Sequence, residues 1–483
     1  MTIATVVNVN HIDGIPAVDV LKQSNPTPEK QIAALPASFY SDFLSILSKS
    51  RLPSAIRTLL PYEDRPNMLS LLAGKPNPAL FPITALSVTV RSPIDSSSST
   101  QLTIDGKMLE DALQYGPTQG VPQAHKWFVG LQEVAHNRPA TGGEWGLSVG
   151  NGSQDLIYKA FAALVNPGDP VLVEAPVYAG VIPLLAANHA SSIEIETDQN
   201  GVSVSSMREV LESWPANTPK PKLFYTVPYG CNPSGVTTTL ERRLEVLKLA
   251  HEHNFIILED DPYYYLYFGD TPRPPSYFEL EGQQGQQGRD SGIPVGRVLR
   301  FDSFSKILSA GMRLGLVTGP RPLVEAINMH SATSNLQPSS TTQIIAYTLF
   351  NSWGYDMFFA HTRLVSEFYR QKRDVFASAL DRHLKGLAEW TLPEAGMFFW
   401  IKLYVPPSSN TSNGAQDAKE GDSEKLIREK ALEAGVLALP GKSFFVKART
   451  TPYVRTAFSL LDENEVDEAL RRLAVVVRAA GAC

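Results

Sequence analysis

Chemically useful side chains follow three apolar runs that are typical of buried strands. The run LFYTV leads into Asn232, FIIL leads into Asp260 and Tyr263, and VLRF leads into the segment Ser303–Lys306. In an open parallel sheet, ligands bind beyond the carboxyl ends of the strands. We therefore expect an asparagine, an aspartate, a tyrosine and a Ser-x-Ser-Lys segment to meet at one edge of a sheet. Each feature alone also has an ordinary structural explanation, because Asn-Pro favours a turn and most lysines are solvated.

Together these residue types suit a pyridine cofactor that carries a phosphate. A lysine forms a Schiff base only as the free amine, so burial and neighbouring cations must lower its pKa. A carboxylate keeps the ring nitrogen protonated, and asparagine and tyrosine suit the ring oxygen. A phosphate binds hydroxyls, backbone N–H groups at a helix N-terminus and an arginine fork. The sequence supplies these last groups in Gly150–Gln154, which opens a predicted helix, and in Arg313, seven residues after Lys306.

Short apolar runs alternate with helical patterns, which predicts an α/β fold with a mostly parallel sheet. The expected strands cover 170–174, 223–227, 255–258, 298–301 and 314–318.

Three helices are predicted from capping and from apolar spacing. Thr238 and Glu241 have the form of a capping box, and the apolar face of the helix that follows would consist of Leu240, Leu244, Leu247 and Ala250. A second helix follows Ser153 and places its apolar residues in phase at Ile157, Phe161 and Leu164. The segment that begins DENEV near the end of the sequence is typical of an amphipathic helix.

The chain of 483 residues is long enough for two or three domains. We expect an N-terminal arm with part of a small domain in 1–104, a large cofactor-binding domain in 105–370, and a C-terminal small domain in 371–483. Polar stretches that contain too little apolar surface to offset the entropy of ordering are predicted to be surface loops; these are 95–100, 280–296 and 406–425.

Composition argues against several classes of partner. The formal net charge is −6 and no long basic run is present, so nucleic acid and anionic membrane are not expected as partners. Two cysteines, Cys231 and Cys483, are expected to be reduced thiols and offer no metal-binding pattern. No membrane span and no targeting signal are visible, which makes the cytoplasm the expected location.

The motifs NGSQDL, NPSG, EDDPYY and SFSKILSAGMRLG, in this order, resemble those of the fold-type I (class I/II) aminotransferases. Within that family the chain is similar to the kynurenine/2-aminoadipate and fungal aromatic amino acid aminotransferases, from about Met68 to Ser459. The resemblance implies a large domain with a mostly parallel sheet between helices, a smaller α+β domain, and pyridoxal 5'-phosphate as the cofactor.

The resemblance also implies roles for the residues that match. Lys306 would hold the cofactor covalently and then move the substrate proton, Asp260 would pair with the ring nitrogen, and Tyr178 would stack on the ring. A pairing shifted by one residue, Asp261 with Tyr264, is an alternative for Asp260 and Tyr263. The remaining cofactor ligands would be Asn232 and Tyr263 at the ring oxygen and, at the phosphate, Ser153, Gln154, Ser303, Ser305 and Arg313.

Substrate and partner contacts follow in the same way. Arg455, with Asn232, would bind the substrate α-carboxylate, and Tyr115 would reach the phosphate of a partner subunit, which implies a homodimer. Gly74 and Arg57 would belong to a segment over the substrate, where Arg57 would meet a second carboxylate or cap a helix. The chain departs from the family at Ala310, where proline is common, and at Glu394–Met397, where a second glycine is usual; the latter affects the shape of the substrate pocket.

The expected activity is ping-pong transfer of the amino group of an aromatic amino acid, or of 2-aminoadipate or kynurenine, to a 2-oxo acid such as 2-oxoglutarate. Another reaction on the same cofactor, by a lyase, decarboxylase or condensing enzyme, is an alternative, because fold does not determine function. A regulatory sensor with an aminotransferase-like domain is a second alternative. Only about 65 residues precede the segment MLSLLAGKPNP, with no basic recognition-helix pattern, which argues against that sensor.

Overall fold

The computed structural model describes residues 33–481, apart from 64, 96, 141, 288–292 and 407–420. Cys483 and parts of the polar stretches 280–296 and 406–425 lie outside the described residues.

An eight-stranded sheet forms the centre of the larger core, in the order β3-β10-β9-β8-β7-β4-β5-β6. The strands from β9 to β5 are parallel neighbours, whereas β10 runs antiparallel to β3 and β9, and β6 runs antiparallel to β5. The expected mostly parallel sheet is confirmed. The bounds are β3 (Trp145–Gly150), β4 (Pro170–Ala175), β5 (Ser191–Asp198), β6 (Gly201–Val202), β7 (Leu223–Thr226), β8 (Ile256–Asp261), β9 (Val298–Ser303) and β10 (Gly315–Pro320).

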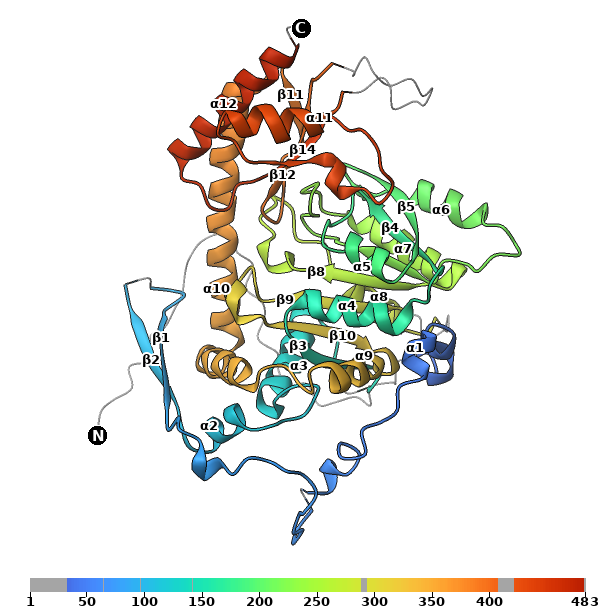
Figure 1. The fold of residues 1–483 in the computed structure, drawn as a ribbon, viewed down its shortest axis with the longest axis vertical. Helices are drawn as coiled ribbons and strands as arrows, with labels where there is room; N and C mark the ends of the chain where they lie inside the picture. The colour runs from blue at the N-terminus through green and yellow to red at the C-terminus, as the bar shows by residue number, and fades with distance from the viewer. Residues whose placement is uncertain are drawn as a thin grey trace. The chain divides into compact units, whose positions relative to one another are not determined.

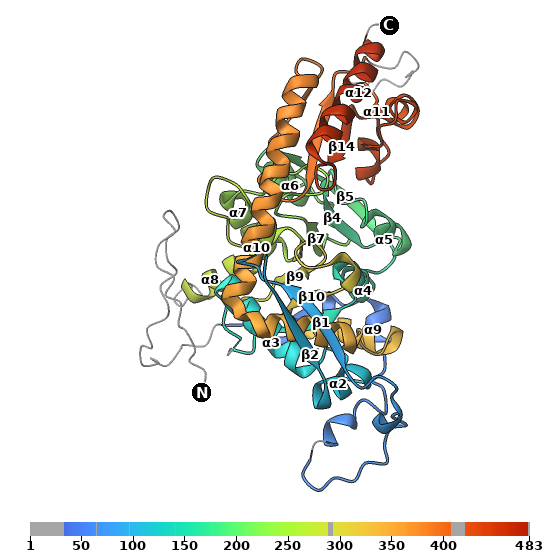
Figure 2. The same cartoon turned by 90° about the vertical axis from the view of Figure 1, so that its left-hand side faces the viewer.

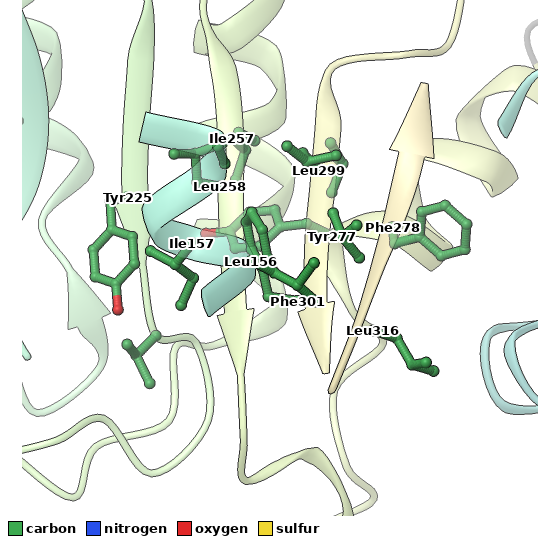
Figure 3. Close-up of a cluster of buried hydrophobic side chains, with 14 of the residues drawn as sticks. Leu156, Ile157, Tyr225, Ile257, Leu258, Tyr277, Phe278, Leu299, Phe301 and Leu316 are labelled. Atoms are coloured by element: carbon green, nitrogen blue, oxygen red, sulfur yellow. The ribbon is translucent and has the colours of Figure 1, made fainter. Parts of the chain in front are cut away.

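Helices cover both faces of this sheet, so its central strands are buried throughout, as their continuous apolar runs require. On one face, α4 (Ser153–Leu164) contributes Leu156 and Ile157 to the buried cluster that also holds Leu258 and Phe301 (Figure 3). On the other face lie α3 (Pro122–His136) and α8 (Tyr277–Gln287), which meet where His136 packs edge-on against Phe278.

A second core surrounds a four-stranded antiparallel sheet, in the order β11-β12-β14-β13. Its strands are β11 (Ala388–Trp390), β12 (Phe398–Leu403), β13 (Leu439–Pro440) and β14 (Tyr453–Ala457). The element α10 (Ser340–His383) consists of two helices that meet at a kink at Gly354, whose φ is +65°. The helix after the kink joins the two cores, because Phe358 lies in the first cluster and Phe376 in the second (Figures 1 and 2). The predicted domain boundary at residue 370 falls within this helix, and it stays a prediction.

The other helices and a β-hairpin lie around the two sheets and in the N-terminal segment. They include α1 (Ile46–Lys49), the hairpin of β1 (Leu86–Arg91) and β2 (Ser99–Ile104), α2 (Gly106–Leu113), α5 (Ile182–Ala187), α6 (Val204–Glu212), α7 (Leu240–His253), α9 (Arg321–Ser334), α11 (Ser423–Lys425) and α12 (Glu463–Gly481). The predicted helix after Ser153 and the predicted helix near the end of the chain are confirmed as α4 and α12.

The start and the buried face of α7 differ from the prediction. The capping residue is Thr239, whose hydroxyl accepts a hydrogen bond from the Arg242 backbone N–H, and not Thr238. Leu240 is 43% exposed and Leu244 is 39% exposed. The face is rotated because Arg243 is buried, its guanidinium donating to three backbone carbonyls and lying over the ring of a tyrosine. A prediction of the buried face from the apolar residues alone does not reveal that an arginine is buried.

The predicted loop at 280–296 is wrong in its first half, because α8 continues to Gln287. Glu281, which counted as a polar loop residue, is 1% exposed. Its carboxylate accepts hydrogen bonds from the backbone N–H groups of Gly296 and Arg297 and from the Arg138 guanidinium. The other two polar stretches also contain ordered structure, since Ser99 and Thr100 belong to β2 and Ser423 is buried at the start of α11.

We expect Glu281→Ala to lower the free energy of unfolding by about 3–5 kcal/mol, because it leaves the buried guanidinium of Arg138 with a much weaker partner. The nearest other carboxylate, Glu144, is 3.8 Å from Arg138. Urea unfolding followed by circular dichroism measures the change. Asp467→Ala is the control, since its ion pair with Arg382 is exposed and solvent-exposed ion pairs contribute little to stability. Equal losses in both variants would contradict this interpretation.

Candidate active site

The register of β10 brings together the segments that carry the phosphate-binding candidates. Gly315, the first residue of β10, pairs with Gly150 at the end of β3 and with Ser303 at the end of β9. Since β10 is antiparallel to both, the residues before it lie at the edge where β3 and β9 end. Arg313 therefore reaches Ser305, donating from Nη1 to Oγ at 3.1 Å, and donates from Nη2 to the Asn151 carbonyl at 3.4 Å.

The N-terminus of α4 lies at the same place. Gly152, its N-cap, has φ +86° and provides no side-chain cap. A Cβ at Gly152 would stand 2.3 Å from Arg313 Nη2, so only glycine allows this close approach. The uncapped N–H groups of α4, the hydroxyls of Ser303 and Ser305, and the Arg313 fork form a set of donors suited to a phosphate. A cavity of about 250 Å³ adjoins Arg313 and Asn151.

Asp260 is buried next to this edge, on the face of the sheet that α4 covers. One carboxylate oxygen, Oδ2, accepts a hydrogen bond from the Tyr225 hydroxyl at 2.5 Å. The other, Oδ1, is buried and has no hydrogen-bond partner in the described protein. Burial raises the pKa of Asp260 to about 7. A carboxylate in this state favours a cationic partner opposite Oδ1, since such a partner would stabilise its ionised form.

Asp261 and Tyr264 have other contacts, on the opposite face of the sheet. Asp261 accepts a hydrogen bond from the buried guanidinium of Arg300 at 2.8 Å, and the Tyr264 hydroxyl donates to the Ala135 carbonyl at 2.7 Å. Arg300 also contacts Glu259 and Asp302, so the pair lies within a buried ion network. These contacts favour the Asp260 and Tyr263 pairing over the shifted alternative.

Lys306 is half-buried and forms no hydrogen bond or ion pair within the described ranges. Burial lowers the pKa of its amine, and the positive charges of Arg313 and Arg455 lower it further. A larger fraction of the amine is therefore unprotonated at a given pH than for a solvated lysine. Tyr178 shares these neighbours: burial and Asp260 raise the pKa of its hydroxyl, while Arg455 and Arg313 lower it. Gln154 supports the Tyr178 segment by donating to the Gly180 carbonyl at 3.0 Å.

Arg455 comes from β14 of the smaller sheet. Its Nη1 donates to Asn232 Oδ1 at 3.0 Å, and its Nε is buried with no partner in the described protein. The guanidinium lies 4.4 Å from the ring centre of Phe398 and 5.2 Å from that of Phe444. Among the described residues, no carboxylate forms an ion pair with it. Burial lowers its pKa, but an arginine stays charged, so this cation lacks an anion.

Three of the predicted site residues do not join this group. Tyr115 is 57% exposed, and Gly74 is exposed, with no atom within 4 Å of a Cβ placed there. Arg57 donates from Nη1 to Thr118 Oγ1 at 2.7 Å and does not cap a helix. Tyr263 does join the group: it is buried and packs edge-on against Phe398, the ring beneath Arg455.

Sequence reasoning missed Tyr225, Phe398 and Phe444. Tyr225 lies in the interior of the run LFYTV, where it was counted as an apolar strand residue. Its position two residues from the end of that run, on the next strand to Asp260, was the available signal. Phe398 is the first residue of β12 and Phe444 the last residue of the 3-10 helix Gly441–Phe444, and no motif indicates that they flank Arg455.

Neither a metal site nor a membrane span is found in the described ranges. No group of three or more His, Cys, Asp or Glu side chains is placed to hold a metal ion, and no helix there is long and apolar enough to cross a membrane.

Comparison with known proteins places the chain in a family. Residues 100–473 match the family model of aminotransferase class I and II. An aminotransferase of Emericella nidulans, tdiD, is 44% identical over 88% of this chain and 93% of its own. The mitochondrial kynurenine/alpha-aminoadipate aminotransferase of Bos taurus is 36% identical over 91% of this chain and 99% of its own. Other relatives at 28–30% identity are named aromatic amino acid aminotransferases.

Comparison with solved structures gives the same family. A crystal structure of the kynurenine aminotransferase of Pyrococcus horikoshii, in complex with PMP, KYN and KYA, covers 90% of this chain and 97% of its own, with 28% identity and a TM-score of 0.66. The protein belongs to the aminotransferase class I and II family, and it is a transaminase of PLP fold type I. The resemblance inferred from the motifs is confirmed.

The raised pKa of Asp260 predicts a pH effect on the cofactor-free protein. Because the pKa rises from about 4 in the unfolded chain to about 7 on folding, the stability that its protonated form provides is full below about pH 4 and lost as pH rises through about 7. Asp260→Asn still accepts from the Tyr225 hydroxyl but does not ionise. We expect this variant to lose less stability than the wild type between about pH 4 and 7, by up to a few kcal/mol.

Thermal unfolding of both cofactor-free proteins across this range measures the difference. Asp467→Asn is the control, because that exposed carboxylate has a lowered pKa. Glu174, whose pKa burial also raises to about 7, contributes the same slope to all three proteins. Parallel pH profiles for the wild type and Asp260→Asn would exclude the buried, unpaired state of this carboxylate.

Proposed function

We propose that the protein binds pyridoxal 5'-phosphate at Lys306 and transfers the amino group of an aromatic amino acid, kynurenine or 2-aminoadipate to a 2-oxo acid by a ping-pong cycle. One observation carries the proposal. The charges of Arg313 and Arg455, which has no anion in the described protein, depress the pKa of Lys306 together with burial. Tyr178 lies within reach of the charges of both Arg455 and Asp260, whose Oδ1 has no partner there.

The residues present fit the cofactor on the evidence of the buried Asp260 Oδ1, which lacks a partner. Asp260 would pair with the ring nitrogen, Tyr178 would stack on the ring, and Asn232 and Tyr263 would bind the ring oxygen. The phosphate would be held by Ser153, Gln154, Ser303, Ser305 and Arg313. When bound, the cofactor supplies an electron sink that stabilises negative charge at the substrate Cα.

The protein's own groups account for the remaining chemistry. The neutral amine of Lys306 is a base that can take a proton at Nζ and return it, and its lowered pKa keeps it unprotonated over more of the working pH range. Arg455 would bind the substrate carboxylate through the guanidinium face that now lacks a partner, with Asn232 beside it. Holding the carboxylate at one point orients the Cα–H bond and lowers the entropic part of the barrier.

The donor class is proposed from the relatives and from the rings around Arg455. Relatives are named for kynurenine, aminoadipate and aromatic amino acids. Phe398 and Phe444 lie against the guanidinium, and Trp400 packs edge-on against Phe444. An aromatic donor side chain would find apolar partners there. As acceptor we propose 2-oxoglutarate, which meets the same carboxylate site. A role for Gly74 and Arg57 over the substrate also stays a proposal.

We also propose that the protein acts as a homodimer in which Tyr115 reaches the partner's phosphate site. The exposure of Tyr115 supports this, as do large apolar side chains in the N-terminal segment that are almost fully exposed in the single chain, among them Leu52, Leu69, Leu71 and Leu80. Such surface is typical of an interface. The domain limits 1–104, 105–370 and 371–483 and a cytoplasmic location are retained as proposals; the mammalian relatives are named mitochondrial.

Lys306→Ala is expected to lower kcat by at least about 100-fold, the usual range for loss of a positioned base. Without an acceptor, the wild type should convert an amino donor to its 2-oxo acid in an amount equal to the enzyme subunits, and the variant should not.

A panel of phenylalanine, tyrosine, tryptophan, kynurenine and 2-aminoadipate, analysed by mass spectrometry, identifies the donor. Lys159→Ala, at a buried lysine paired with Asp155, is a control for general damage. Multiple turnovers without acceptor would indicate another reaction class.

Arg455→Ala is expected to lower kcat/KM for the amino donor about 100-fold, because a desolvated charge pair with the carboxylate is lost. Arg455→Lys keeps the charge but not the bidentate guanidinium, so its kcat/KM should lie between those of the wild type and Arg455→Ala. The exposed Arg382→Ala serves as the matched control. Steady-state kinetics with the preferred donor measures all three. A normal kcat/KM in Arg455→Ala would place the carboxylate site elsewhere.

A further inference from the structure

The loop 445–451, between the short 3-10 helix Gly441–Phe444 and β14, is held by one side chain of the large sheet. That side chain is Glu194 of β5. Its Oε1 accepts hydrogen bonds from the backbone N–H groups of Val446 at 2.8 Å and Lys447 at 3.1 Å. Its Oε2 accepts from the Arg449 guanidinium. Glu194 therefore joins the large sheet to a loop that leads directly into the strand of Arg455.

This contact is shielded from water on the glutamate side. The exposed fraction of the Glu194 side chain is 6%, whereas that of Arg449 is 33%. Val446 also packs against the apolar core of the large sheet. A buried carboxylate that receives two backbone N–H groups and a guanidinium is satisfied only while the loop stays in place, because release would leave its charge without partners.

The anchored loop directly follows Phe444, the last residue of the 3-10 helix, which contacts the active site in two ways. Its carbonyl accepts a hydrogen bond from the Val177 backbone N–H at 2.8 Å, next to Tyr178. Its fully buried ring lies 5.2 Å from the Arg455 guanidinium and packs edge-on against Trp400. A shift of this loop would therefore disturb the segment of Tyr178 and one wall of the Arg455 site together.

We propose that Glu194 is a positioning residue for substrate binding: through its anchor on 446–449 it sets Phe444 between the Tyr178 segment and Arg455. Glu194 does not touch the reacting atoms, and it acts through the rigidity of the loop. A preorganised guanidinium loses less conformational freedom when it binds a carboxylate, so the anchor strengthens binding of the substrate in the ground state and the transition state alike. The inference rests on the proposed role of Arg455.

Glu194→Ala is expected to raise KM for the amino donor at least about 10-fold while kcat stays within about 3-fold, as loss of uniform binding requires. Glu194→Gln retains one acceptor oxygen and should restore part of the KM. Asp198→Ala is the matched control, since Asp198 lies on the same strand and accepts two hydrogen bonds from Arg242 away from the loop. A fall in kcat alone, or an equal rise of KM in Asp198→Ala, would overturn the proposal.

A second measurement does not depend on turnover. Lys447 and Arg449 are trypsin sites within the anchored loop, and cleavage there needs local opening of the segment. Full-length Glu194→Ala should be cut after these residues at least about 10-fold faster than the wild type and the Asp198→Ala variant, as measured by mass spectrometry of timed digests. Unchanged cleavage would show that Glu194 does not hold the loop.

The two experiments separate this inference from the proposed function. If cleavage rises in Glu194→Ala but Arg455→Ala has normal kinetics, the anchor exists and the carboxylate site lies elsewhere. If kcat/KM falls in Arg455→Ala while Glu194→Ala changes neither KM nor cleavage, the proposed function stands. The proposed role of Glu194 as an anchor of the loop is then wrong.

Discussion

The active site depends on the pairing of β10 between β3 and β9. Because Gly315 pairs with both Gly150 and Ser303, the polypeptide before β10 and the polypeptide after its two neighbours leave the sheet at the same edge. A slip of one residue would turn alternate side chains to the opposite face and separate Arg313 from the α4 N-terminus. Glycine at 152 and 315 permits the close approach, since a Cβ at either position would lie within 2.5 Å of the facing nitrogen.

Burial of incompletely paired polar groups is unfavourable for folding, and this site contains several of them. Asp260 leaves one oxygen without a partner, Arg455 leaves Nε without one, and Lys306 has a depressed pKa. On the far face of the same sheet, Glu259, Asp261 and Asp302 are instead arranged around the Arg300 guanidinium. These three carboxylates share a guanidinium partner, whereas Asp260 accepts only from a neutral hydroxyl.

Motif-bearing parts of the chain were predictable, whereas single-residue details of packing were not. The strands that end at Asn232, Asp260 and Ser303 follow from apolar runs, because central parallel strands are buried on both faces. The cap of α7 was misplaced by one residue and its face was rotated, because the buried Arg243 satisfies its donors with backbone carbonyls distant in sequence. Similarly, composition predicts a loop at Glu281, although its partners at 138, 296 and 297 bury it within a helix.

The sequence by itself determined the family, the residue types of the site and the order of strands and helices along the chain, because these depend on local composition and spacing. Only the tertiary structure decided which partner each group has. It made β10 antiparallel to β9, paired Asp261 with Arg300, and left Asp260 Oδ1 without a partner. It also placed Val446 of the loop 445–451 on Glu194, 252 residues away in sequence. Such contacts join segments distant along the chain, and their energies depend on burial and geometry, which no local pattern records.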